Sequence, residues 1–486
     1  MLRSTFAVLN ETSKPAELLL LLTRDRSRPL ATQIEDQLRR AIRTGALRPE
    51  ARLPSTRELA RQLAISRGVV VSAYAQLGAE GYLLLEQGRS PRVSGATSLG
   101  TNSAEAELPV ARPRFDFRPG VPDVSLFPRG IWLRSLRAAL SAMPDPELGY
   151  GDPRGVDRLH TALAEYLGRV RGVVANPGSI VITSGYAQGL SLICRALAAT
   201  GARRIAIENP SHPEQRLIAL RAGLELVPIR VDEAGLRIDE LERTDVGAAI
   251  VTPAHQFPSG TVLAAERRTA LLAWLRERDA VLIEDDYDAE YRYDRAPIGA
   301  LQGLEPDRVV YGGSVSKTLA PALRIGWLVL PPRLLDAVAE EKRLADISTA
   351  RIEQYAFADF LARGELDRHL RRMRSHYRQR RDALVETLAT VLPEAVVEGI
   401  AGGLHAAVRL TETDDERAIA DEARRRRIAI ATMSDHLLDL DGPPTLVLGY
   451  AQSTEPAIRL GITELAEAVR ETRRQLRAGV RSQKPR

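Results

Sequence analysis

The chain carries, at residues 308–326, the run R-V-V-Y-G-G-S-V-S-K-T-L-A-P-A-L-R-I-G. Its apolar start predicts a β-strand over Arg308–Gly312, which would place the following serines and lysine at the carboxyl end of that strand. The lysine is unusual here, because the 68 basic residues include only four lysines and Lys317 is the only one between positions 15 and 341. Arginine serves most surface roles but cannot form a Schiff base, so Lys317 is a candidate for amine chemistry.

Apolar segments of strand length recur on both sides of this run. Six more strands are expected, over Ser179–Thr183, Arg204–Glu208, Leu224–Ile229, Gly247–Thr252, Ala280–Glu284 and Ile325–Leu330. Helical segments such as Tyr186–Ala199 and Ala264–Arg278 separate most of them, which predicts an α/β fold with a largely parallel, doubly wound sheet. From Arg333 onward, long helices and then short strands predict a smaller C-terminal α+β subdomain. Those strands are expected around Leu404–Leu410, Ile428–Ile430 and Leu446–Tyr450.

Polar side chains follow these strands at their carboxyl ends, where the ligands of an open α/β sheet bind. The turn Ser184-Gly185-Tyr186-Ala187 opens a helix, and its free N–H groups suit a phosphate. Asp285, Asp286 and Tyr287 follow a second strand, and Asn209-Pro210-Ser211-His212 follows a third. One Ser-Gly turn or one Asp pair is usually a cap or a solvated loop, but their joint occurrence at successive strand ends favours a single binding site.

This set of side chains fits pyridoxal 5′-phosphate (PLP). Lys317 would form a Schiff base with the aldehyde, and Asp285 would keep the pyridine nitrogen protonated. Tyr287 would hydrogen-bond the 3′-oxygen, and His212 would stack on the ring. The phosphate would be bound by Ser314, Ser316 and Arg324 together with the turn at Gly185, Tyr186 and Ala187.

The N-terminal segment differs in charge and in pattern. Residues 24–95 hold 13 arginines and seven acidic residues, a net charge of +6 in a chain whose total is +5, which indicates contact with a polyanion. An apolar helical stripe ends at Gly45, Ser55 and Glu58 have capping-box spacing, and Ser66 is expected as a second N-cap. Strands over Tyr82–Glu86 and Pro91–Ser94 then flank a turn at 87–90. Three helices and a β-wing make up a winged helix-turn-helix.

The string L-P-S-T-R-E-L-A-x-x-L-x-x-S-R (53–67) and the string A-Y-x-x-L-x-x-E-G-Y (73–82) resemble the GntR-type DNA-binding domain. The resemblance implies an operator of double-stranded DNA with half-sites. The start of the recognition helix would reach base edges, and the preceding helix and the wing would contact the backbone or the minor groove. The candidate residues are Ser66, Arg67, Gly68 and Val69 in the recognition helix, Ser55 and Arg57 in the preceding helix, and Gly88 and Arg89 in the wing.

Residues 114 to about 480 resemble the fold-type I aminotransferases. The motifs that carry this likeness are Y-G-D-P-R-G (150–155), T-S-G-Y-A-Q (183–188), E-N-P (208–210), F-P-S-G (257–260), E-D-D-Y-D (284–288) and S-V-S-K-T-L-A-P-A-L-R-I-G (314–326). The resemblance implies a head-to-tail homodimer in which Tyr150 reaches the phosphate of the neighbouring subunit. A GntR-type head joined to such a body resembles the MocR type of bacterial transcriptional regulator, as do F-x-P-G-x-P-D (117–123) and H-Q-F-P-S-G (255–260).

Two positions depart from the catalytic relatives. Phe257 stands where they carry an asparagine for the 3′-oxygen, and Val447 stands where they carry an arginine for the substrate carboxylate, although Arg409 could substitute for it. The departures favour a regulator that senses PLP or an amino compound, with vitamin B6 metabolism as one setting. An active aminotransferase with an accessory DNA-binding domain is the alternative, and a head that docks proteins is a third.

Composition bounds the remaining classes. The one cysteine, Cys194, excludes a disulfide framework and a Cys-rich zinc site, and no metal ligands are assigned. The leucine run 18–22 is too short for a membrane span, so a cytoplasmic protein without a membrane partner is expected. The expected domains are a winged helix-turn-helix over 24–95, a linker over 96–113, a large PLP-binding domain over 114–330 and a small subdomain over 331–480.

Overall fold

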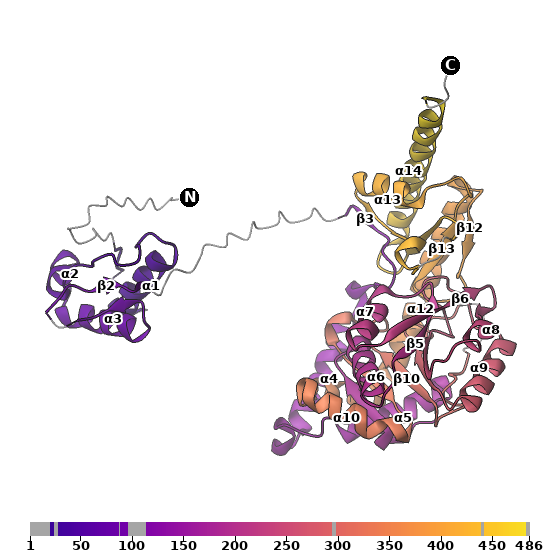
Figure 1. Ribbon diagram of the computed structural model, residues 1–486, viewed down its shortest axis with the longest axis horizontal. Coiled ribbons are helices and arrows are strands. Elements are labelled where there is room, and N and C mark those ends of the chain that lie inside the picture. Colours follow the sequence, from indigo (N-terminus) through magenta and orange to yellow (C-terminus); the bar gives the residue numbers. More distant parts are fainter. Residues whose placement is uncertain are drawn as a thin grey trace. The chain divides into compact units, whose positions relative to one another are not determined.

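The computed structural model describes residues 20–23, 28–86, 88–95, 113–293, 298–438 and 442–482. Two compact units make up the chain, Met1–Ala111 and Arg112–Arg486 (Figure 1). The linker expected over 96–113 lies outside the described residues except for Pro113, and Gln87 of the expected wing turn also lies outside them.

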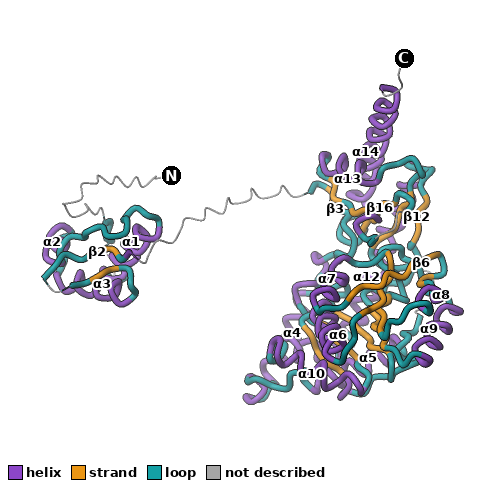
Figure 2. The backbone as a smooth tube through the Cα atoms, in the orientation of Figure 1, coloured by secondary structure: helices purple, strands orange, loops and turns teal. Residues whose placement is uncertain are grey.

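The first unit consists of three helices and a short antiparallel strand pair (Figure 2). Its elements are α1 (Leu30–Arg43), α2 (Thr56–Gln62), α3 (Arg67–Ala79), β1 (Leu83–Leu84) and β2 (Arg92–Val93). Leu83 pairs with Val93, so the strands flank the expected wing but are shorter than the segments predicted for them. The order of elements confirms the winged helix-turn-helix.

The core of the first unit ties its helices together. Buried side chains of all three helices and both strands pack in one cluster, including Leu38, Leu59 and Leu77. Tyr74 donates from its hydroxyl to the carbonyl of Pro54 at 3.0 Å, which holds α3 against the segment before α2. Ser55 accepts from the Glu58 N–H at 3.2 Å, as expected of an N-cap. Ser66 occupies the N-cap position of α3, as expected, although its side chain makes no capping hydrogen bond.

The second unit contains an eight-stranded sheet in the order β4-β11-β10-β9-β8-β5-β6-β7. The strands are β4 (Ile180–Thr183), β5 (Arg204–Asn209), β6 (Glu225–Asp232), β7 (Gly235–Leu236), β8 (Ala248–Val251), β9 (Val281–Asp285), β10 (Val309–Ser314) and β11 (Gly326–Val329). The strands from β10 to β6 run parallel, whereas β11 is antiparallel to both of its neighbours and β7 to β6. The segment 315–325 is too short for a crossover helix, so β11 must return beside β10 in the opposite direction.

Helices cover both faces of this sheet, as the alternation of side chains along β9 shows. Ile283 packs in the apolar cluster that includes α6 (Tyr186–Ala199) and α7 (Pro213–Arg221). Leu282 packs in the cluster that includes α8 (Ile238–Leu241) and α9 (Ala265–Glu277). These two clusters confirm the doubly wound α/β arrangement. All seven expected strands are present, and α6 has the expected bounds.

A third group of helices surrounds the β4 end of the sheet. They are α4 (Arg129–Ala142), α5 (Asp157–Arg171), α10 (Pro332–Asp346) and α11 (Arg351–Ala362). α10 packs against α6, and α11 packs against α4 and α5. The segment just after residue 330 therefore continues to pack on the large sheet layer. The exact domain boundary at this point stays a prediction.

The C-terminal part is a smaller α+β layer (Figure 1). Its elements are α12 (Glu365–Val391), β12 (Val396–Glu398), β13 (His405–Arg409), α13 (Glu416–Arg425), β14 (Ile428–Ala429), β15 (Ala431–Thr432), β16 (Thr445–Gly449) and α14 (Glu455–Ser482). The four-stranded sheet has the order β12-β13-β16-β15, while β14 pairs with β3 (Phe115–Asp116) instead. Cys194 is buried and free. Within the described ranges, no helix combines the length and the apolar character that a bilayer span needs.

A buried ion pair connects α5 to the centre of the large sheet. Arg171 donates from Nε to Asp286 Oδ2 at 2.7 Å, and both side chains are 2% exposed. Tyr311 of β10 donates to the same oxygen at 2.6 Å, and Arg171 Nη1 donates to the carbonyl of Ile298 at 2.7 Å. Removing one member of such a pair leaves an uncompensated charge in the interior.

We therefore expect Asp286→Ala to lower the free energy of unfolding of the second unit by about 3–5 kcal/mol. The control is Arg169→Ala, which removes an equally short pair with Asp367 at 2.7 Å whose arginine is 60% exposed and should cost at most about 1 kcal/mol. Urea unfolding followed by tryptophan fluorescence measures both. Equal losses in the two variants would contradict a stabilising role for the buried pair.

Candidate functional site

The residues that follow the strands of the large sheet surround a cavity of about 280 Å³. Nine of the eleven side chains expected around PLP line it: Tyr186, Ala187, His212, Asp285, Tyr287, Ser314, Ser316, Lys317 and Arg324. Gly185 lies beside it, under the guanidinium of Arg324. These residues come from the ends of β4, β9 and β10 and from the segments after β5 and before β11, which is where a sheet of this order opens.

Lys317 is held inside the cavity by the backbone of a distant segment. Its Nζ donates to the carbonyl of Gly120 at 2.5 Å. A Cβ on Gly120 would lie 3.2 Å from that nitrogen, so the glycine allows the chain to pass close to the amine. Burial lowers the pKa of Lys317, although Asp285 acts in the opposite direction. A lowered pKa leaves more of the amine neutral near pH 7, which is the form that attacks an aldehyde.

The turn between β4 and α6 is shaped for the neighbouring arginine. Gly185 has φ of +88°, and a Cβ there would lie 2.5 Å from Arg324 Nη2. Arg324 donates to the carbonyl of Ser184 across this gap. A glycine is therefore required at 185, both for the backbone conformation and for the space. The guanidinium, the Ser314 and Ser316 hydroxyls and the N-terminus of α6 together offer donors for an anion.

Asp285 has one satisfied and one unsatisfied oxygen. Oδ2 accepts from Gln215 Nε2 of α7 at 2.5 Å, whereas Oδ1 is buried without a hydrogen-bond partner among the described residues. Burial raises the pKa of Asp285 well above its ordinary value, and the charge of Asp286 adds to that rise. A buried carboxylate oxygen facing a cavity without a donor fits a ligand that brings its own N–H, and a protonated pyridine nitrogen is such a donor.

Each acidic group in the run 284–288 accepts a hydrogen bond from a different part of the fold, although Asp285 and Asp286 each keep one oxygen without a partner among the described residues. Glu284 accepts from the N–H groups of Leu301 and Gln302, Asp285 from Gln215, Asp286 from Arg171 and Tyr311, and Asp288 from His255. Burial raises the pKa of Glu284 to about 7. Among the acids of this run, Asp285 is the one that lines the cavity, so it is the carboxylate that a ligand in the cavity would meet.

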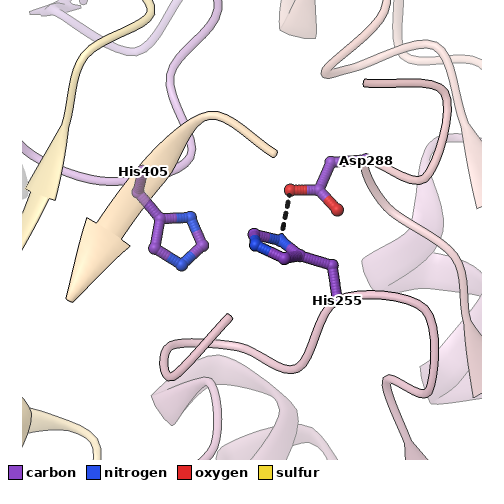
Figure 3. Close-up of side chains that lie close together, drawn as sticks. All are labelled: His255, Asp288 and His405. Atoms are coloured by element: carbon purple, nitrogen blue, oxygen red, sulfur yellow. Dashed lines mark hydrogen bonds and ion pairs between the residues drawn. The ribbon is translucent and has the colours of Figure 1, made fainter. Parts of the chain in front are cut away.

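Three side chains beside the cavity have the spacing of a metal site (Figure 3). They are His255, Asp288 and His405, whose ligand atoms lie within 4.8 Å of one another. Most of these ligand atoms already make hydrogen bonds within the protein. His255 Nδ1 lies 2.9 Å from Asp288 Oδ2, His255 Nε2 lies 3.2 Å from the Gly399 carbonyl, and His405 Nε2 lies 3.2 Å from the Pro258 carbonyl. The expectation that no metal is bound stays a prediction.

The two departures from catalytic relatives are visible in the geometry. Phe257 lines the cavity and packs its ring against His212 at a centroid distance of 5.1 Å, so an apolar edge stands near the ring-stacking position. Val447 is fully buried in the small sheet, where it pairs with Ala407 and Ala431. Arg409 pairs with Glu398 at 2.9 Å and lines a different cavity, so it does not take the place of the missing arginine around Lys317.

Tyr150 does not line the cavity in its own chain. It is 88% exposed, in contrast to the other tyrosine side chains expected at the site.

Three contacts that shape the site could not be predicted from the sequence: the carbonyl of Gly120 on Lys317, the amide of Gln215 on Asp285 and the imidazole of His255 on Tyr287. Gly120 belongs to the motif at 117–123 and His255 to the motif at 255–260, so these contacts give both motifs a physical role.

In the first unit, the candidate DNA-binding residues lie at the starts of α2 and α3 and between β1 and β2. Seven of the eight are exposed: Ser55, Arg57, Ser66, Arg67, Gly68, Gly88 and Arg89. Val69 instead packs partly against the core of the unit. Arg67 Nε lies 3.4 Å from Thr56 Oγ1, and Arg89 pairs with Glu86 at 2.6 Å with 72% of its side chain exposed.

Two family models match the chain in the regions just described. The model for bacterial regulatory proteins of the gntR family matches residues 30–93. The model for aminotransferase class I and II matches residues 132–438. Among solved structures, the chain is similar to a multiple substrate aminotransferase from Thermococcus profundus, with 26% identity and a TM-score of 0.69 over 79% of this chain and 98% of that one. An archaeal alanine:glyoxylate aminotransferase gives 27% identity and a TM-score of 0.68, covering 74% of this chain and 91% of that one.

Two relatives that match along both units carry the names of transcriptional regulators. The chain is 33% identical to the HTH-type pyridoxine biosynthesis transcriptional regulator PdxR of Corynebacterium glutamicum, over 93% of this chain and 99% of that protein. It is 31% identical to the probable rhizopine catabolism regulatory protein MocR of Rhizobium meliloti, over 93% and 96%. With a GntR helix-turn-helix unit, an aminotransferase body and these full-length matches, the chain belongs to the HTH-type transcriptional regulators of the MocR and PdxR type.

Proposed function

We propose that this regulator binds PLP on Lys317 and uses the occupied body to control the binding of its helix-turn-helix unit to DNA. The observation that carries the proposal is the single cavity in which the Lys317 amine, the unsatisfied Asp285 oxygen and an anion site at Arg324 lie together. When bound, the cofactor supplies an aldehyde for the lysine and a pyridine ring that withdraws electrons. Asp285 holds a proton at the ring nitrogen, while Ser314, Ser316 and the α6 N-terminus bind the phosphate.

The cavity supports a sensing role over turnover of α-amino acids. Of the described residues that line it, the lysine and the arginine are Lys317 and Arg324, and both are assigned to the cofactor. A buried substrate carboxylate would therefore lack an arginine of its own. The effector in this proposal is PLP itself or an amino compound, and the similarity to a pyridoxine biosynthesis regulator supports a setting in vitamin B6 metabolism. An active aminotransferase with an accessory DNA-binding domain remains the second candidate, and turnover of amino donors with a keto acid would establish it.

The body is proposed to form a homodimer with sites completed by Tyr150 of the neighbouring subunit. Large apolar side chains are exposed close together in the sequence over residues 124–150: Val124, Leu133, Leu140, Leu148 and Tyr150. Leu133 and Leu140 lie seven residues apart on α4 and so share one face of that helix, and an exposed apolar face suits an interface between copies of the chain. A dimer would also present two helix-turn-helix units to two half-sites of an operator in the cytoplasm.

Lys317→Arg should abolish covalent attachment of PLP, because a guanidinium keeps the charge but cannot form a Schiff base. Lys342→Arg is the matched control, since Lys342 is also buried but pairs with Asp346 at 2.6 Å. Borohydride reduction of each PLP-treated variant, followed by peptide mass spectrometry, measures the label. If the Lys317→Arg variant still carries the label on another residue, the assignment of Lys317 as the attachment site is wrong.

Light scattering at micromolar concentration should give a dimer mass for the full-length protein. Leu140→Glu, which places a charge on the exposed apolar residues, should weaken dimerisation about tenfold or more without changing thermal unfolding of the first unit. Tyr150→Phe should leave the dimer intact and weaken PLP binding. A cofactor-bound wild-type protein that scatters as a monomer would contradict the shared site.

Arg67→Ala should cost about 1–3 kcal/mol on the operator and relax the preference at one base pair, because the first turn of α3 reaches base edges. Arg89→Ala should weaken operator and scrambled duplexes about equally and lower the salt slope by about one, as expected for a phosphate contact. Titrations against both duplexes at two salt concentrations measure these effects. Unchanged operator affinity and base preference in Arg67→Ala would mean that α3 is not the recognition helix.

A further inference from the structure

The hydroxyl of Tyr287 lies between the Lys317 cavity and a buried histidine. The tyrosine lines the cavity, and its oxygen lies 3.0 Å from His255 Nδ1. The same nitrogen lies 2.9 Å from Asp288 Oδ2, so one imidazole N–H faces two oxygens. His255 and Asp288 are 5% and 1% exposed, which removes water as a competing partner. The phenol therefore has a fixed protein partner on the side away from the cavity.

The second nitrogen of His255 is also engaged. Nε2 lies 3.2 Å from the carbonyl of Gly399, an atom that only accepts hydrogen bonds. With an acceptor at each nitrogen, the ring is satisfied when both nitrogens carry hydrogen. Burial alone would lower the pKa of His255, but the Asp288 carboxylate beside it raises the pKa above its ordinary value. Geometry and electrostatics both favour an imidazolium that donates toward Tyr287.

A metal ion would need these same atoms. Binding at His255 Nδ1 would displace its hydrogen from Asp288 and Tyr287, and His405, whose ring centroid lies 5.2 Å away, would have to add its Nδ1. Burial and the positive charge of His255 lower the pKa of His405, so it is the neutral member of the pair. Figure 3 shows the dashed contact between His255 and Asp288, with His405 across from them on β13. The hydrogen-bonded arrangement uses the atoms without an ion.

We propose that His255, held by Asp288, is a positioning residue that donates to the Tyr287 hydroxyl and so directs the phenol's own hydrogen into the Lys317 cavity. The inference rests on the proposed binding of PLP, whose 3′-oxygen is the acceptor that Tyr287 would meet there. Because Phe257 offers no donor at the cavity wall, Tyr287 carries this contact without the help of a second polar side chain at that position.

The direction of the expected pH shift depends on which protonation form of the bound cofactor the Tyr287 hydrogen bond stabilises. A hydrogen bond donated to the deprotonated 3′-oxygen stabilises that form and lowers the pH at which the visible band of bound cofactor changes. The Tyr287 hydroxyl already lies within hydrogen-bond distance of Asp288, and His255 competes for that carboxylate. Without His255, the hydroxyl would donate more to Asp288 and less into the cavity. The transition should then move to higher pH. The other titratable and charged groups around Tyr287 and His255 are Asp285, Glu208, Arg292, His405 and Lys317, and they are unchanged in the His255 and Asp288 variants.

The test compares His255→Leu, His255→Gln and Asp288→Asn in the full-length protein loaded with PLP. The leucine variant should shift the spectral transition to higher pH and weaken PLP binding about three- to tenfold, and the asparagine variant should do the same in part. The glutamine amide can still donate to Tyr287 and should restore much of the affinity. His405→Gln is the matched control, because it removes an equally buried imidazole that hydrogen-bonds Pro258. It should titrate as wild type.

A PLP analogue with hydrogen in place of the 3-hydroxyl separates positioning from a merely structural role. Wild type and His255→Leu should bind this analogue with equal affinity, because the contact that His255 supports is absent. A His255→Leu protein that loses the same factor with PLP and with the analogue, or that titrates as wild type, overturns the inference while leaving PLP binding on Lys317 in place. A wild-type protein that binds neither compound refutes the proposed function itself.

Discussion

Burial of the acidic run 284–288 at the end of β9 is the constraint on which the rest of the second unit depends. Four carboxyl groups and a phenol within five residues cannot be taken out of water unless each finds a partner. The partners come from α5, α7, β10, the segment at 301–302 and the segment at 255. Satisfying these groups therefore sets how the helices and loops close around the carboxyl ends of the strands.

Two carboxylates of that run, Asp285 and Asp286, each keep one oxygen without a hydrogen-bond partner among the described residues, and Asp285 is the one that lines the cavity. An unsatisfied carboxylate oxygen at a cavity wall can accept a hydrogen from a ligand that enters the cavity. The same edge of the sheet carries the Lys317 amine and the anion donors at Arg324. This edge therefore offers groups that fit the proposed cofactor, while the apolar Phe257 lines the cavity wall and Val447 is buried in the small sheet.

The two units differ in how they use arginine. In the first unit Arg57, Arg67 and Arg89 are exposed at helix starts and at the wing, where a polyanion can reach them. In the second unit Arg171 is buried and donates hydrogen bonds to Asp286 and to a backbone carbonyl. Arg216 donates to the carbonyls of residues 435–437. The same side chain is thus exposed to solvent at these positions of the first unit and buried in hydrogen bonds at these positions of the second.

The sequence by itself determined seven of the eight strands of the large sheet, the helix α6 and nine of the residues around the cavity. It could do so because strand length, helical periodicity and the polar residues after each strand are local patterns, and parallel strands bring their carboxyl ends to one edge. Only the tertiary structure decided that Gly120 holds Lys317 from 197 residues away, that Arg171 pairs with Asp286, and that His255 meets Tyr287. It also decided that Arg409 pairs with Glu398 and that the Ser66 side chain makes no hydrogen bond at the N-cap of α3. These outcomes depend on which distant groups packing brings within hydrogen-bond distance, and no local pattern of residues records that.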